Sequence, residues 1–175
     1  ALNTTIFLCA LVGHSHGAIT SQGGEFPLVG DIAGHQQHPS VALHREGGLV
    51  AWQNATVDSG GERVVVQALG ADYRGLGAPQ VVSQNITGQN DLNPAVAALP
   101  EGRSVVVWES GPRSSQDIFI RFLDAQGQFQ TDIQPVNTFQ AGVQSDAAVS
   151  ALANGNVLVV WASDGQDGSG EGIYG

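Results

Sequence analysis

The sequence predicts an all-β protein, an array of four-stranded blades like those of a β-propeller. A unit with an apolar run, a turn and a second apolar run that ends in Trp occurs three times, at residues 39–52, 94–108 and 147–161. All three Trp residues of the chain close a copy of this unit, and they stand 56 and then 53 residues apart. Self-similarity at such a period is the mark of a repeat architecture, in which each repeat is one supersecondary unit.

Each unit begins with two predicted strands. The first strands cover residues 41–43, 96–99 and 149–152, and turn signals follow them, of which Asn154-Gly155 predicts a two-residue hairpin. The second strands, at 49–52, 105–108 and 157–161, are apolar at every position. A strand with one face exposed to solvent alternates apolar and polar residues. A continuous apolar run rich in Val therefore predicts burial on both faces. We therefore expect these to be inner strands with buried Trp rings.

Two further strands complete each predicted blade. Third strands are expected at 64–69 and 118–123 and begin again at 173–174, and fourth strands at 80–82 and 134–137. Four strands in little more than fifty residues is the size of a propeller blade. The units span 39–93, 94–146 and, in part, 147–175. Residues 23–30 align with the later fourth strands and predict an odd strand before the first unit. The array is thus expected to hold about three blades, incomplete at both ends, and the alternative fold is a β-sandwich.

The first 17 residues differ from the repeat region, 18–175. An apolar run at 5–12 is followed by small residues near position 17, as in the core and cleavage end of a secretory signal. We interpret residues 1–17 as a truncated signal segment, which predicts a secreted or cell-surface protein. The alternative is a first buried strand. The run is too short to span a bilayer.

The charge of the chain limits the classes of partner it can bind, and its cysteine content limits disulfide formation. The formal net charge is −10, with six Arg and no Lys. A chain this acidic lacks the clustered cations needed to bind nucleic acid or an anionic membrane surface. Cys9 is the only cysteine, so an intrachain disulfide is excluded. A glycan or protein partner outside the cell stays open.

One polar loop predicts a metal site. Calcium takes six to eight oxygen ligands, and a short loop rich in Asp, Gly and Ser can wrap them around one ion. The ligands are predicted to be Asp164, Asp167, Ser169 and Glu171. The equivalent loops keep only Asp58 and Glu62 in the first unit, and Glu109 and Asp117 in the second. The alternative interpretation is a solvated loop that uses Gly and Asp for its turns.

The sequence holds no recognisable catalytic motif. It lacks a His-Glu-x-x-His helix and a phosphate-binding loop. Two of the sixteen acidic residues could meet in space, but the sequence gives no reason to choose a pair. We therefore expect no enzymatic activity.

The repeat resembles one found in large secreted bacterial proteins. The resemblance is carried by residues 94–108, by the Asp-Gly-x-Asp-Gly-Ser-Gly-x-Gly-Ile-Tyr-Gly stretch at 164–175 and by 124–127. Such proteins often carry haemolysin-type calcium-binding or cadherin-like modules as well. The array, the predicted export signal and the lack of a catalytic constellation lead us to expect a non-enzymatic structural or adhesive module of a secreted or surface protein. The resemblance implies calcium only at the third unit. The alternative is a propeller that binds a glycan or acts as an enzyme on an extracellular glycan.

Overall fold

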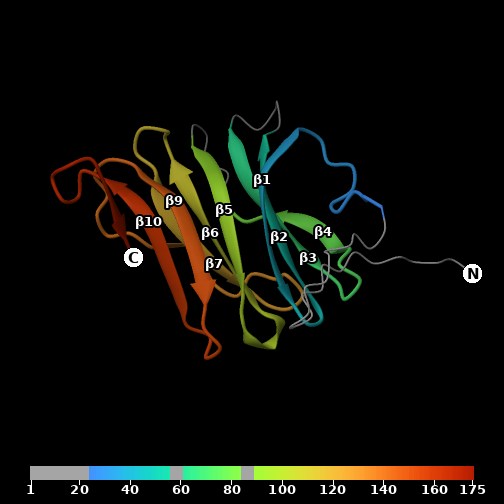
Figure 1. The fold of residues 1–175 in the computed structure, drawn as a ribbon. Helices are drawn as coiled ribbons and strands as arrows, with labels where there is room; N and C mark the ends of the chain where they lie inside the picture. The colour runs from blue at the N-terminus through green and yellow to red at the C-terminus, as the bar shows by residue number, and fades with distance from the viewer. Residues whose placement is uncertain (1–23, 56–60, 84–88) are drawn as a thin grey trace, which may run out of the picture.

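The computed structural model of the protein describes residues 24–55, 61–83 and 89–175 (Figure 1). These residues form three antiparallel sheets and contain no α-helix. The first sheet consists of β1 (His35–His44), β2 (Gly47–Ala55), β3 (Glu62–Leu69) and β4 (Gly75–Val81). The second consists of β5 (Asn90–Ala98), β6 (Ser104–Gly111), β7 (Asp117–Leu123) and β8 (Gln134–Pro135). The third consists of β9 (Gln144–Ala151), β10 (Val157–Asp164) and β11 (Glu171–Tyr174).

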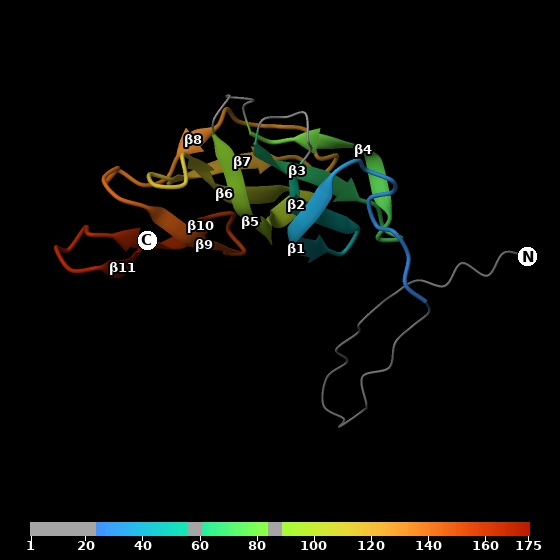
Figure 2. The ribbon, with the colours of Figure 1, turned by 90° about the horizontal axis from the view of Figure 1, so that it is seen from above.

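Strands that follow one another along the chain are neighbours in every sheet. The three sheets stack side by side, so that β5 lies between β1 and β9. In Figure 2, β4 and β8 lie at the opposite edge of the stack from β1, β5 and β9. This is the arrangement of propeller blades around an axis, with the first strand of each sheet nearest the axis. The predicted blades are confirmed, and the β-sandwich alternative is wrong.

The core lies between the sheets, where the sequence predicts burial on both faces. Trp52, Trp108 and Trp161 are 3%, 1% and 8% exposed. Trp108 packs against Leu49 and Val64 of the first sheet, and Trp161 packs against the second sheet. The run at 105–108 is buried on both faces because one face contacts the first sheet and the other the third. The expected burial on both faces is wrong for the run at 157–161, because no described sheet follows the third one and Leu158 is exposed.

Two local expectations are corrected. The turn at Asn154-Gly155 is not a two-residue hairpin, because β9 ends at Ala151 and β10 begins at Val157. The N–H of Gly155 donates to the carbonyl of Leu152 at 2.9 Å, and Gly155 is left-handed at φ 87°. A β-turn followed by a left-handed Gly makes a longer loop than the primed turns do.

The expected odd strand is also absent, since residues 24–34 contain no strand. Pro27 has no N–H to donate to a sheet, and Gly30 turns the chain at φ 71°. This segment instead packs its side chains against the face of the first sheet that points away from the second sheet. Leu28, Val29 and Ile32 cover a cluster made by Val50, Trp52, Val65 and Leu69.

The predicted signal segment, residues 1–17, lies outside the described residues, as does Asp58. Across the ranges that the structure describes, no helix is long and apolar enough to cross a membrane.

Candidate functional site

Three equivalent residues gather where the first strands of the sheets begin. His38, Asn93 and Asp146 each take a left-handed backbone conformation, with φ of 49°, 47° and 54°. The pairing register slips beside each of them, which marks a β-bulge. A bulge re-aims its side chain away from the regular alternation of the strand. The three residues line an open depression of about 390 Å³, together with Ser40, Pro94 and their neighbours.

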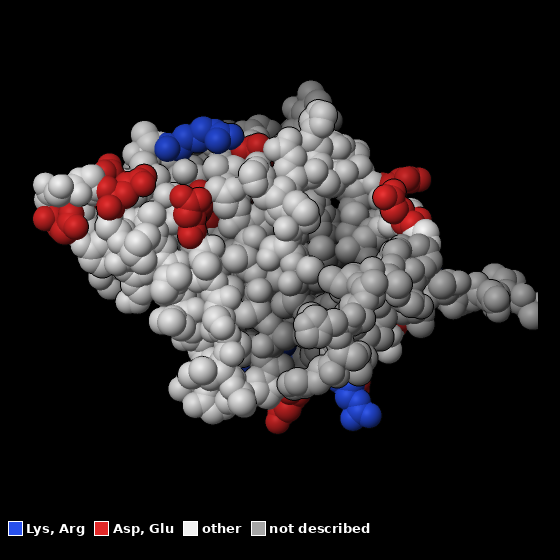
Figure 3. Space-filling model, viewed as in Figure 1, with Lys and Arg blue, Asp and Glu red and all other residues white. Residues whose placement is uncertain are grey.

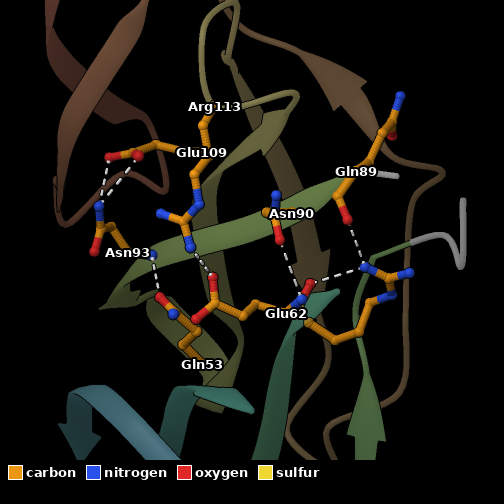
Figure 4. A network of polar contacts seen from close by, with 8 residues as sticks. Gln53, Glu62, Gln89, Asn90, Asn93, Glu109 and Arg113 are labelled. Atoms are coloured by element: carbon orange, nitrogen blue, oxygen red, sulfur yellow. Dashed lines mark hydrogen bonds and ion pairs between the residues drawn. The ribbon is translucent and has the colours of Figure 1, made fainter. Parts of the chain in front are cut away.

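A buried carboxyl group is hydrogen-bonded to two residues that line this depression. Glu109 is in β6, directly after Trp108, and is 2% exposed. The Asn93 side-chain amide donates to both Glu109 carboxyl oxygens, at 3.0 and 3.1 Å. The backbone N–H of Asp146 donates to Oε1 at 2.8 Å. Glu109 therefore joins the bulges of the second and third sheets, and its contact with Asn93 is drawn in Figure 4.

The same link is made by a neutral residue one sheet earlier. Gln53 directly follows Trp52, as Glu109 follows Trp108, and its Oε1 accepts a hydrogen bond from the backbone N–H of Asn93 at 3.4 Å. The equivalent position after Trp161 is Ala162. Holding a bulge thus needs only an amide oxygen, so the negative charge of Glu109 is not required for that structural role.

Burial raises the pKa of the Glu109 carboxyl, and the nearby charge of Asp146 acts in the same direction. The Asn93 amide, the Asp146 N–H and the charge of His38 oppose this rise and do not cancel it. Asp146 and His38 are both exposed. The site therefore combines a buried carboxyl that holds its proton to higher pH with an exposed carboxylate and an imidazole, a combination suited to general acid–base chemistry.

The four predicted calcium ligands lie elsewhere, around the loop that joins β10 to β11. Asp164 and Glu171 are opposite each other in the pairing of these strands, and the N–H of Gly165 donates to the carbonyl of Gly170. The Asp167 carboxylate accepts a hydrogen bond from the N–H of Ser169 at 3.0 Å. Acidic side chains are visible over this side of the molecule (Figure 3). Among the described residues no three His, Cys, Asp or Glu side chains are grouped closely enough to hold a metal ion. Calcium binding here stays a prediction.

The sequence pattern gives little reason to pair Glu109 with Asp146, which stand 37 residues apart. Its strongest signal is variation within the repeat. The bulge position carries His, Asn and Asp in turn, and the position after Trp carries Gln, Glu and Ala.

No protein-family profile matches the chain, and no curated protein matches its sequence. Solved structures do match its fold. An endo-arabinase from Bacteroides thetaiotaomicron is 12% identical at a TM-score of 0.52, with 83% of this chain and 57% of that chain covered. A thermostable family-43 glycoside hydrolase is 13% identical at 0.50, over 83% and 54%. An α-L-arabinanase from Penicillium chrysogenum, complexed with arabinobiose, is 14% identical at 0.53, over 78% and 44%.

The chain thus spans about half the length of the structures it matches. At this identity the comparison shows the fold, an all-β propeller arrangement. It also corrects the expectation that the chain is no enzyme, because these similar folds are those of glycoside hydrolases. That expectation rested on missing sequence motifs, and paired carboxyl groups in a propeller need no local motif.

Proposed function

We propose that the protein acts on a glycan, with the carboxyl pair Glu109 and Asp146 at the centre of its site. The single observation that carries this proposal is the buried Glu109, whose pKa is raised and which is hydrogen-bonded to Asn93 and Asp146 at the depression where the three sheets converge. The similarity of the fold to an arabinanase complexed with arabinobiose supports a glycan over other substrates.

Glycoside hydrolysis generally needs two carboxyl groups with different protonation states. One carboxylic acid protonates the leaving oxygen, and one carboxylate activates water or attacks the sugar. Glu109 suits the first role because burial raises its pKa. Asp146 suits the second because it is exposed in the depression. Asn93 now covers both Glu109 oxygens, so a bound sugar has to displace its amide to receive the proton.

Release of reducing ends tests this proposal. The full chain is incubated with arabinan and with a panel of other polysaccharides, beside Glu109→Gln and Asp146→Asn. Each substitution removes one carboxyl and keeps its shape, and we expect activity to fall by about 10²- to 10⁴-fold. The matched control is Gln53→Ala, which alters the equivalent link one sheet away. Turnover that survives both carboxyl substitutions would contradict the assignment.

A further inference from the structure

The two interfaces between the three sheets are built in the same way. On each sheet, the forward face is defined here as the face that meets the next sheet along the chain. In the first sheet it contains Leu49 and Val64, which pack against Val106 and Trp108 of the second sheet. In the second sheet it contains Val105 and Ile118, which pack against Val159 and Trp161 of the third.

The third sheet carries the same forward face. Leu158 precedes Trp161 by three residues, as Leu49 and Val105 precede their own Trp residues. Ile173 is equivalent to Val64 and Ile118, because each lies one residue before the partner of its Trp in the strand pairing.

The forward face of the third sheet differs from the forward faces of the first two sheets in its solvent exposure. Leu49 and Val105 are 1% and 0% exposed, whereas Leu158 is 59% exposed. Val64 and Ile118 are both 0% exposed, whereas Ile173 is 78% exposed. Large apolar side chains gathered on one exposed face mark an interaction surface.

From this continuity we infer that the forward face of the third sheet docks a further sheet of the same repeat, which places a Trp against Leu158 and Ile173. A second copy of this chain fits less well. To pack as the sheets of this chain pack on one another, the second copy would have to present the Trp52 face of its first sheet. Residues 28, 29 and 32 already cover that face. The inference rests on packing between sheets and is independent of the proposed glycan site.

The test extends the chain with its own repeat. Tyr174 is equivalent to Phe119, so a second copy of residues 121–175 fused after Gly175 continues the register. It supplies a fourth strand to the third sheet and then a new sheet with its own Trp. Ile173→Cys in the original copy, with Cys9→Ala, reports on the face through its rate of labelling by a thiol reagent. We expect labelling in the extended chain to be slower by about tenfold or more than in the unextended chain.

The matched control is Val41→Cys on β1, which is 56% exposed and should label at the same rate in both chains. A second extended chain carries a copy of residues 67–120 after Gly175 in place of 121–175, so that the added sheet presents Trp108. This chain is used if the first extended chain does not fold. Unchanged labelling in both extended chains would overturn the inference. So would protection of Ile173→Cys in the unextended chain that grows with protein concentration, because the occupant would then be a second copy.

Discussion

Replacing a buried Trp by Phe should cost more in the third sheet than in the second. The Nε1–H of Trp161 donates to Oε1 of Gln144 at 3.0 Å, and Gln144 is 0% exposed. The residue equivalent to Gln144 in the second sheet is Asp91, whose side chain is shorter by one methylene. Among the described residues, Nε1 of Trp108 and Oδ2 of Asp91 have no hydrogen-bond partner, and both residues line a hollow of about 160 Å³.

The magnitude follows from these contacts. Either substitution removes part of a ring from a packed core, at a cost of about 1–2 kcal/mol. Trp161→Phe also leaves the buried Gln144 oxygen without its donor, which adds about 1–3 kcal/mol. Trp108→Phe breaks no bond between described residues and adds nothing of this kind. We therefore expect Trp161→Phe to be the more destabilising substitution by about 1–3 kcal/mol.

Urea unfolding followed by far-UV circular dichroism measures this difference, because the backbone signal does not depend on the substituted Trp. Gln144→Leu, alone and together with Trp161→Phe, completes a double-mutant cycle that isolates the hydrogen bond. The reasoning fails if the two Phe variants lose equal stability, if Trp108→Phe loses more, or if the cycle gives no coupling.

Three further predictions follow from the charged groups. Asp91→Ala should lower the free energy of unfolding by about 3–5 kcal/mol, because it strips the carboxylate 3.7 Å from the buried Arg63. Arg113→Ala, which breaks an exposed pair with Glu62, should cost under about 1 kcal/mol, and equal losses in urea unfolding would contradict the distinction. The contribution of Glu109 to stability is full below its unfolded-state pKa and is lost as pH rises through its raised folded-state pKa. Glu109→Gln should therefore flatten the pH dependence of the melting temperature and be the more stable form above that pKa, whereas parallel wild-type and variant curves would count against it. If calcium binds at Asp164, Asp167, Ser169 and Glu171, millimolar Ca²⁺ should raise the melting temperature and Asp167→Asn should blunt the rise, and a chelator-insensitive curve would end that prediction.

Much of the fold can be predicted from the sequence because its signal is local and repeated. The runs before Trp52 and Trp108 are buried on both faces, as continuous apolar strands predict, whereas Leu158 in the run before Trp161 is exposed. Residues 24–34 defeat the same reasoning, since their alignment with later strands ignores Pro27 and the left-handed Gly30.

The candidate site could not be predicted in the same way. Its chemistry depends on a contact between β6 and the bulge of β9. The left-handed conformation at position 146 could not be predicted either, because the residue is Asp and not Gly. The raised pKa of Glu109 follows from burial, which is a property of the packed sheets and not of any short motif. The loop at 164–171 can be found from the sequence because its acidic residues are close together along the chain. Glu109 and Asp146 meet in space but are distant in sequence.

A crystal structure of Glu109→Gln, the variant expected to fold and to lack turnover, soaked with an arabino-oligosaccharide, tests the proposed glycan site. We expect a sugar in the depression between His38, Asn93 and Asp146, with the Asn93 amide displaced. A sugar oxygen should then lie about 2.6–3.2 Å from the side chains at positions 109 and 146. Sugar bound at any other place, or an empty depression at saturating oligosaccharide, would contradict the assignment of the glycan site to Glu109 and Asp146.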